Sequence, residues 1–472
     1  MRTTDAGGNL VSVTTSGLKE DANTYSGGNL IKTVTGGNGT FTYNYDKTYA
    51  HRLTSVSDGH VTQSLSYDSV GNVTGTSLTG GSLTMKTSAT YLNDGNLTAS
   101  VTGASGEKTT YAYATTQSQM LGAPTSVTNA LGTTVQNTYD SFGRITKNAI
   151  ANSATLAYTY ANGNLASVER TGAVAGAQEY RFAYDAFGSR TAIQVGSHTL
   201  GRYTYGPGSG SLTSQTYGNG DTVSFTYDTL GRVKTTTYSG GRTLSYTYNG
   251  EGQLASMTDS TGNTDTYQYD SLGRLVGSGQ SASGSRASYT YDSSGRMTGR
   301  DFSYPGLTTA AERYYYNTAT SDSIPDGLLT SMSMVDWRKI NLSYDSLERL
   351  TSRDIAGTVT QSYTYAAGSA SGTTSTRIAT YESKYNGTSA AKYQYAYDAA
   401  GNITRQTNKL DNSYWAYAYD VQGELQYATS YAANGTASAR YKYYYDAAGN
   451  LKSWQVTNDD NSQTLELSLI HI

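Results

Sequence analysis

One short phrase recurs along this chain and constrains its fold more than any other feature. From Asp228 through Asn249 and Asp270 to Asp292, the phrase returns after 21, 21 and 22 residues. A fixed period of this length is typical of repeat proteins, in which every unit packs against its neighbours. The clearest copies are "TYDSFGRI" at 138–145, "TYDTLGRV" at 226–233, "QYDSLGRL" at 268–275 and "TYDSSGRM" at 290–297.

Each unit is predicted to be a β-hairpin. The residues before the aspartate alternate Tyr with another residue, as in "SYTYD" and "TYQYD", which places both tyrosines on one face of a strand. Asp favours the first position of a type I turn, where its side chain accepts a hydrogen bond from the backbone two residues on. Glycine fits the left-handed position that follows. A second strand rich in Thr, Ser and Val completes a hairpin with a bulged loop.

An isolated hairpin is marginal in water, so the units must pair with one another. The predicted fold class is therefore all-β, with tandem antiparallel hairpins forming one curled, spiralling sheet, because a twisted sheet of so many strands does not stay flat. Cross-strand stacking of tyrosines is expected to hold neighbouring units in register.

The Tyr, Asp and Gly of nine YDxxG units are predicted to be the structural anchors of the repeats. They are Tyr67, Asp68, Gly71, Tyr139, Asp140, Gly143, Tyr184, Asp185, Gly188, Tyr227, Asp228, Gly231, Tyr269, Asp270, Gly273, Tyr291, Asp292, Gly295, Tyr397, Asp398, Gly401, Tyr419, Asp420, Gly423, Tyr445, Asp446 and Gly449.

Several stretches depart from the repeat. Glu348 occupies a position where glycine is expected, so its turn should be strained or differently built. The loop in 45–53 is longer, and 100–138 and 301–341 are interpreted as long loops or degenerate repeats. No domain boundary is predicted: residues 1–466 form one array that is expected to be truncated at both ends, and 467–472, "LSLIHI", are interpreted as a non-native tail derived from a sequencing adapter.

The composition supports β-structure and excludes several classes of function. Tyrosine occurs 45 times and glycine 52 times, beside only 4 prolines, which favours pleated strands and tight turns. The net charge of -3 predicts no nucleic-acid partner. The lack of cysteine excludes disulfides and thiolate chemistry. No apolar run approaches a membrane span, and no signal peptide is visible.

The repeated aspartates are interpreted as turn residues, and no catalytic, cofactor or metal site is predicted. Eleven Tyr-Asp copies are too many for one active site, and Asp-x-x-Gly offers one carboxylate where calcium needs several oxygens. His51, His60, His198 and His471 form no metal-ligand pattern. No Gly-x-Ser-x-Gly elbow is present, so the chain is predicted not to be an enzyme.

The phrases "YDSFGR", "YDSLGR" and "YDAAGN" resemble the YD repeats of the Rhs (rearrangement hotspot) family over nearly the whole chain. The resemblance implies a β-sheet that spirals into a hollow shell. In bacterial polymorphic toxins and in the C components of insecticidal toxin complexes, that shell encloses a C-terminal toxin, and the teneurins of animals use a similar one. The proline-rich segment with a "DPxG"-like motif that processes such family members has no counterpart here, so no catalytic residue is carried over.

The expected function is structural: a bacterial, secreted or cell-surface shell segment that encapsulates a C-terminal toxin cargo of the same full-length chain. Secretion-system components are further candidate partners. The alternative is a cell-surface, adhesin-like array that binds carbohydrate through its tyrosines, because aromatic faces stack on sugar rings. A tyrosine that packs within the sheet is the simpler interpretation, since same-face pairs stabilise sheets.

Overall fold

The computed structural model consists of strands joined by turns. It describes residues 2–13, 21–35, 39–92, 95, 97–114, 122–151, 154–172, 178–317, 327–336, 338–445, 451–458 and 467–468, and none of these residues is helical. All strands belong to one 41-stranded sheet.

Most strands are five to nine residues long, in line with the alternating Tyr and Thr patterns of the sequence. The first twenty are β1 Arg2–Thr4, β2 Leu10–Val13, β3 Asp21–Ser26, β4 Asn29–Thr35, β5 Gly39–Tyr45, β6 Leu53–Ser57, β7 Val61–Tyr67, β8 Val73–Gly80, β9 Leu83–Tyr91, β10 Thr98–Thr102, β11 Lys108–Tyr113, β12 Pro124–Thr128, β13 Thr134–Tyr139, β14 Ile145–Ile150, β15 Thr155–Ala161, β16 Asn164–Thr171, β17 Gln178–Tyr184, β18 Arg190–Val195, β19 His198–Tyr205 and β20 Leu212–Tyr217. The others are β21 Thr222–Tyr227, β22 Val233–Tyr238, β23 Thr243–Tyr248, β24 Leu254–Asp259, β25 Thr264–Tyr269, β26 Leu275–Gln280, β27 Arg286–Tyr291, β28 Met297–Ser303, β29 Ala310–Tyr316, β30 Leu329–Ser333, β31 Lys339–Tyr344, β32 Leu350–Ile355, β33 Val359–Ala367, β34 Thr374–Tyr385, β35 Thr388–Tyr397, β36 Ile403–Asn408, β37 Tyr414–Tyr419, β38 Leu425–Tyr431, β39 Ala437–Tyr445, β40 Leu451–Asn458 and β41 Leu467–Ser468.

The sheet is a continuous meander with two rims. Each strand pairs antiparallel with the strands before and after it in sequence. The turns after odd-numbered strands therefore all lie on one rim, which we call the aspartate rim because it carries the Tyr-Asp turns of the repeat, such as 228–232 after β21. The turns after even-numbered strands, such as 238–242 after β22, lie on the opposite rim, which we call the return rim.

A β-bulge next to the aspartate rim recurs from hairpin to hairpin. The register slips between Thr226 and Tyr227 in β21 and between Thr247 and Tyr248 in β23. Most pairings across the return rim, for example between β22 and β23, run without a slip. The exceptions among the described strands are β18–β19, β34–β35 and β38–β39. A bulge bends its strand and increases the local twist, so repeating it at one rim curls the whole sheet in one sense.

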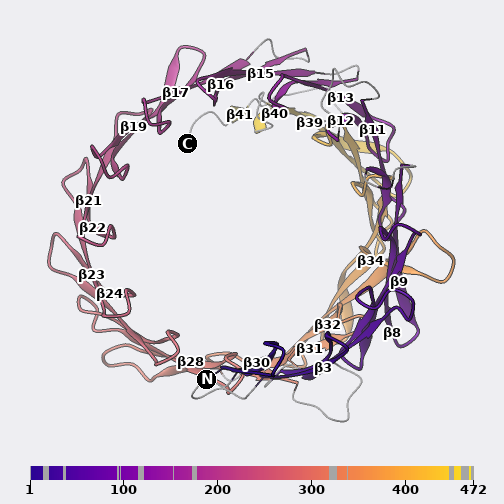
Figure 1. Cartoon of the computed structure of the whole chain (residues 1–472), viewed down its shortest axis with the longest axis horizontal. Helices are drawn as coiled ribbons and strands as arrows, with labels where there is room; N and C mark the ends of the chain where they lie inside the picture. Colours follow the sequence, from indigo (N-terminus) through magenta and orange to yellow (C-terminus); the bar gives the residue numbers. More distant parts are fainter. Residues whose placement is uncertain are drawn as a thin grey trace.

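The curled sheet forms an open ring that winds past its own beginning (Figure 1). Strands β3, β9, β15, β21 and β28 follow one another around the ring, and β31 to β39 then run alongside the first strands. β34 contacts β9 directly, the one contact between described strands that are not sequence neighbours. The expected fold class, an all-β sheet of tandem hairpins that spirals, is confirmed.

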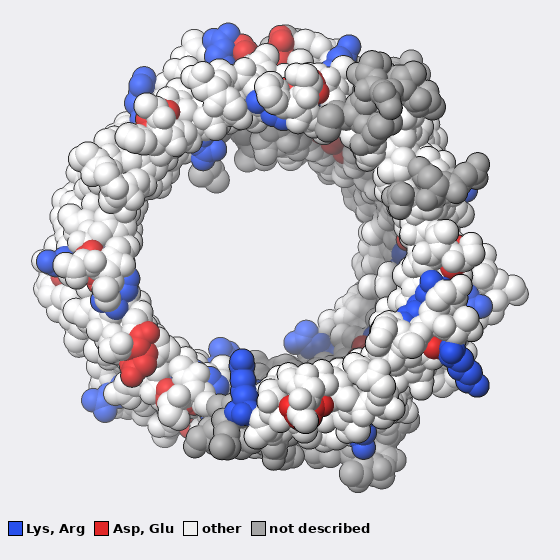
Figure 2. Space-filling view, in the orientation of Figure 1, with Lys and Arg blue, Asp and Glu red and all other residues white. Residues whose placement is uncertain are grey.

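The wall of the ring is one sheet thick. The accessible surface is 26970 Å² for 50.3 kDa, whereas a compact monomer of this mass exposes roughly 17,000 Å². Few apolar side chains are buried; Val223 and Leu244, at the return-rim ends of β21 and β23, are examples. Figure 2 shows the wide opening that the wall surrounds, with charged side chains of both signs scattered around it.

Candidate functional site: the wall and its joints

The Asp-x-x-Gly turn is held by its own aspartate. In the turn after β21, a carboxylate oxygen of Asp228 accepts the backbone N–H groups of Leu230 (2.9 Å) and Arg232 (3.0 Å). The N–H of Gly231 donates to the carbonyl of Asp228 at 3.0 Å, and Gly231 adopts a φ of 77°, which L side chains avoid. The residue types of the turn thus follow from its backbone geometry.

The same aspartate is also ion-paired. Arg232 donates Nε to the second carboxylate oxygen of Asp228 at 2.7 Å, and its Nη2 atom lies equally close. The backbone N–H of Arg232, and then its side chain, hold the pKa of Asp228 below the usual value despite partial desolvation. A carboxylate whose oxygens are all engaged in this way acts as a structural group.

Tyrosine hydroxyls link each hairpin to the hairpin before it. The ladder between β22 and β23 ends at Thr235 and Ser245, and the Tyr248 hydroxyl then donates to the carbonyl of Val233 at 2.8 Å. The side chain thereby replaces a main-chain bond that the diverging strands lack. The tyrosines that make this bond are Tyr25, Tyr45, Tyr67, Tyr91, Tyr113, Tyr139, Tyr160, Tyr205, Tyr227, Tyr248, Tyr269, Tyr291, Tyr316, Tyr344, Tyr365, Tyr397, Tyr419 and Tyr445.

The tyrosine ring covers the arginine of the preceding unit. The guanidinium carbon of Arg232 lies 4.3 Å from the ring centroid of Tyr248, and Arg349 lies 4.1 Å from that of Tyr365. Cation–π contacts of this kind contribute about 0.5–1 kcal/mol at exposed sites. Asp, Arg and the next Tyr therefore form one joint that is repeated from unit to unit.

This joint corrects the expectation that stacked tyrosines hold the units together throughout. Between described residues, ring-to-ring contacts occur only in the stretch from Tyr363 to Trp454, for example between Tyr414 and Tyr431 at 4.7 Å. Elsewhere arginine takes the place of the second ring. In these units the guanidinium reaches the ring from the adjacent turn, as Arg232 reaches Tyr248.

The second winding rests on the first through a joint of a different kind, in which the aspartate rim meets the return rim. The hydroxyl of Ser346, in the turn after β31, donates to the carbonyl of Gly80, the last residue of β8. A Cβ on Gly80 would lie 1.8 Å from the carbonyl oxygen of Ser346, so only glycine permits this approach. Leu347 is buried there, with 5% of its surface exposed.

Further contacts continue this joint around the ring. The backbone N–H of Ser369 donates to the carbonyl of Ala104 at 2.9 Å, and Arg377 pairs with Glu107 at 3.3 Å. Farther along, Arg170 of the first winding lies 3.7 Å from Glu424 of the second. The two windings are thus connected at several successive repeats.

Two acidic residues that depart from the repeat lie at this joint. Glu348 has a φ of 65° and donates its N–H to Asp345 as glycine does in the other turns, so the turn is strained rather than differently built. Burial, and then the neighbouring Asp58, raise the pKa of Glu348. Burial and the charge of Asp420 likewise raise the pKa of Glu424.

The structure places the predicted anchors at equivalent positions along the aspartate rim. The described glycines among them all have positive φ, and every described aspartate accepts a hydrogen bond from the backbone N–H four residues on. Tyr184 pairs with Arg190, six residues later in the chain, just as Tyr227 pairs with Val233. Asp446 and Gly449 lie outside the described residues.

The irregular stretches belong to the same sheet. The longer loop after β5 is closed by the N–H of Asp46, which donates to Arg52 at 2.8 Å. The stretches 100–138 and 301–341 contain β11 to β13 and β29 to β31, so they are degenerate repeats. Leu467 and Ser468 pair with β40, and the rest of the suspected tail lies outside the described residues.

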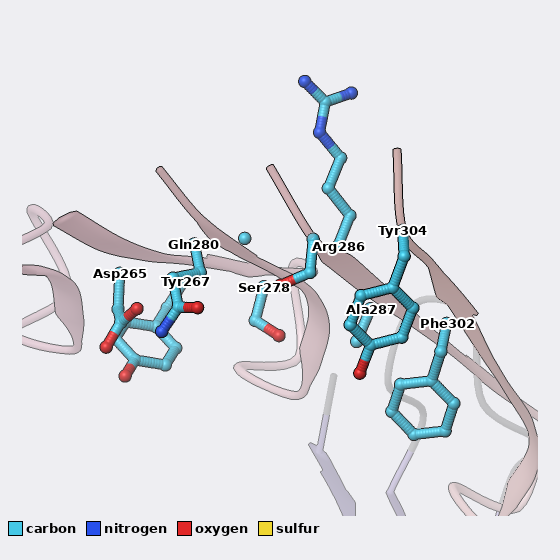
Figure 3. A pocket seen from close by; sticks show the side chains of 10 residues that line it. Asp265, Tyr267, Ser278, Gln280, Arg286, Ala287, Phe302 and Tyr304 are labelled. Carbon is cyan, nitrogen blue, oxygen red and sulfur yellow. The ribbon is translucent and has the colours of Figure 1, made fainter. Parts of the chain in front are cut away.

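The small hollow along β25 to β28 does not bring a set of reactive groups together. It has a volume of 150 Å³ (Figure 3), and there Tyr267, Phe302 and Tyr304 project on one side of the sheet and Arg286 points away. Its lining is aromatic, hydroxyl and amide, with one carboxylate, Asp265. Within the described ranges, no three His, Asp or Glu side chains are placed to hold a metal ion.

Comparison with known proteins agrees with this architecture. The family described as Teneurin YD-shell matches residues 211–370, which carry β20 to β33 and their joints. The crystal structure of TcdB2-TccC3 resembles the whole chain, with a TM-score of 0.65 at 13% identity and coverage of 100% of this chain. These findings support an Rhs/YD-repeat family for this chain.

The YD-repeat chain is much shorter than the structures it resembles. It spans 30% of the TcdB2-TccC3 chain and 26% of the chain in the TcdB2-TccC3-TEV structure, which it matches with a TM-score of 0.55 at 14% identity over 95% of its own length. No curated protein sequence matches significantly. Among the described residues of the YD repeat, no helix is long and apolar enough to cross a membrane.

Proposed function

We propose that this YD-repeat chain is a wall segment of a hollow shell that encloses a polypeptide cargo, namely a C-terminal toxin of the same full-length chain. The observation that carries the proposal is the closure of the wall in two directions. Main-chain ladders and the Asp–Arg–Tyr joints run around the ring, and the rim-to-rim joint from Gly80 to Glu424 runs along its axis.

The proposed mechanism is exclusion. A continuous hydrogen-bonded sheet keeps proteases and other macromolecules from a cargo inside, while the ring leaves room for an unfolded or partly folded polypeptide. The described residues of the wall form joints that hold the sheet together, which supports a structural role.

Limited proteolysis of the complete gene product tests this function. We expect a broad-specificity protease to leave the segment downstream of the repeats intact while the wall is closed. Gly80→Ala should expose that segment, because its Cβ meets the backbone of the second winding. Gly240→Ala is the matched control, since a Cβ there meets nothing within 4 Å. If the downstream segment of the unmodified protein is cut as fast as the isolated segment, enclosure is wrong.

Secretion or display at a bacterial surface, with secretion-system components as partners, is part of the same proposal. The carbohydrate-binding alternative is less well supported by the aromatic geometry. Tyr414 has Tyr431 at 4.7 Å and the guanidinium carbon of Arg405 at 3.6 Å from its ring, so its faces are occupied by the protein. Binding of the purified chain to a glycan array would favour that alternative.

A further inference from the structure

The second variable residue of the Asp-x-x-Gly turn has two different environments in this chain. In the second winding this residue is Leu347, which the return rim of the first winding covers. In the first winding, the same position is held by Phe142, Phe187 and Leu230, which expose 80%, 91% and 74% of their surfaces. The first winding thus exposes large apolar side chains at the turn position whose leucine is buried in the second winding.

The opposite rim carries a matching set of exposed apolar groups. Among the described residues, no later winding rests on the return rim beyond β20, and side chains at its turns are exposed. These side chains are Tyr217, Tyr238, Tyr304, Leu307, Tyr385 and Leu410. The molecule therefore presents one uncovered aspartate rim and one uncovered return rim, the two surfaces that already bind each other inside it.

We propose that a second copy of this chain docks on the first head to tail, with the aspartate rim of one copy on the return rim of the other. The contact continues the joint between the windings, so Phe142, Phe187 and Leu230 take the role that Leu347 plays within the chain. The net charge of -3 opposes this approach only weakly. Because the two surfaces differ, the contact is heterologous and leaves a free rim at each end of the assembly.

Sedimentation velocity of the full chain over a concentration series tests this inference. We expect the average mass to rise with concentration. The triple variant Phe142→Ser/Phe187→Ser/Leu230→Ser should raise the apparent dissociation constant about tenfold or more, because three exposed apolar side chains are lost. Val101→Ser is the control, since Val101 is an exposed valine within β10, near the part of the return rim that the second winding already contacts at Ala104. Circular dichroism checks that the variants keep the sheet.

A second variant separates head-to-tail docking from other forms of association. Tyr304→Ser/Leu307→Ser on the return rim should weaken association as much as the triple variant, and a mixture of the two variants should form one-to-one dimers through the rim that each retains. Unmodified chain that stays monomeric at all concentrations would overturn the inference. So would association that neither rim variant weakens, which would point to pairing of the open strand edges at β1 and β41.

Discussion

At the scale of single residues, one type of residue serves different roles in this wall. Tyr248 and Tyr246 lie two positions apart on β23 and on the same face, but only Tyr248 donates its hydroxyl to the previous hairpin. The Tyr248 side chain therefore donates a hydrogen bond across the gap between two hairpins, whereas the Tyr246 side chain only covers the surface of the sheet.

Tyr248→Phe should lower stability by about 1–2 kcal/mol, because the carbonyl of Val233 loses its partner. Tyr246→Phe should change stability by much less, since the Tyr246 hydroxyl makes no hydrogen bond with the described residues. Urea denaturation followed by circular dichroism compares the two variants. Equal effects of the two substitutions would contradict the proposed joint.

The contribution of Glu348 to the stability of the fold depends on pH. Its folded-state pKa is raised, so its contribution to stability is fully present below the unfolded value of about 4.3 and is lost as the pH rises through the folded value. Glu348→Gln should therefore raise the melting temperature at pH 7 and leave it unchanged near pH 4. An equal shift at both values would show that Asp58 and burial do not act on this carboxyl.

At the scale of the hairpin, much could be predicted from the sequence. Asp, Gly and alternating Tyr each follow from local backbone geometry, so the turn, the strand period and the all-β class were accessible. The hydroxyl bond of Tyr248 and the stacking of Arg232 were not, because both depend on where the ladder between two hairpins ends. The Arg that follows the glycine in many of the repeats was the one feature of the sequence that could have indicated the contact with the tyrosine ring.

The turns of this chain include a natural control for their pH dependence. Asn249 replaces the aspartate and accepts the N–H groups of Glu251 (3.1 Å) and Gln253 (2.8 Å) in the same way. The pKa of Asp228 is lowered in the folded state, so its stabilisation is present above about 3.9, the unfolded value, and is lost as the pH falls.

Hydrogen exchange, corrected for the intrinsic effect of pH, should therefore accelerate below about pH 4 in the β21–β22 hairpin. The β23–β24 hairpin should change less. Asp228→Asn should remove the difference between the two hairpins. If both hairpins of the unmodified chain respond equally to acid, the aspartate does not control the turn.

At the scale of the whole molecule, the local sequence no longer determines whether a turn residue is exposed or buried. Leu230 in "DTLGR" and Leu347 in "DSLER" occupy the same turn position, but one is exposed and the other is buried. The difference arises from the curl accumulated over many bulged hairpins, which brings the turn after β31 onto the turn after β8. No local sequence pattern predicts which two turns meet, although Glu348 in place of glycine showed that the turn after β31 was unusual.

The contact between the windings is the central claim, and a disulfide across it tests that claim most directly. The chain has no cysteine, so Gly81→Cys/Ser346→Cys introduces a single pair; a Cβ on Gly81 lies 3.1 Å from Cβ of Ser346. Ser271, at the same turn position of another repeat, supplies the control pair Gly81→Cys/Ser271→Cys. After mild oxidation, a spiral predicts a cross-link between residues 81 and 346, seen by non-reducing electrophoresis and mass spectrometry, and none in the control. Failure of the 81–346 pair to close, or equal closure of both pairs, would contradict the spiral.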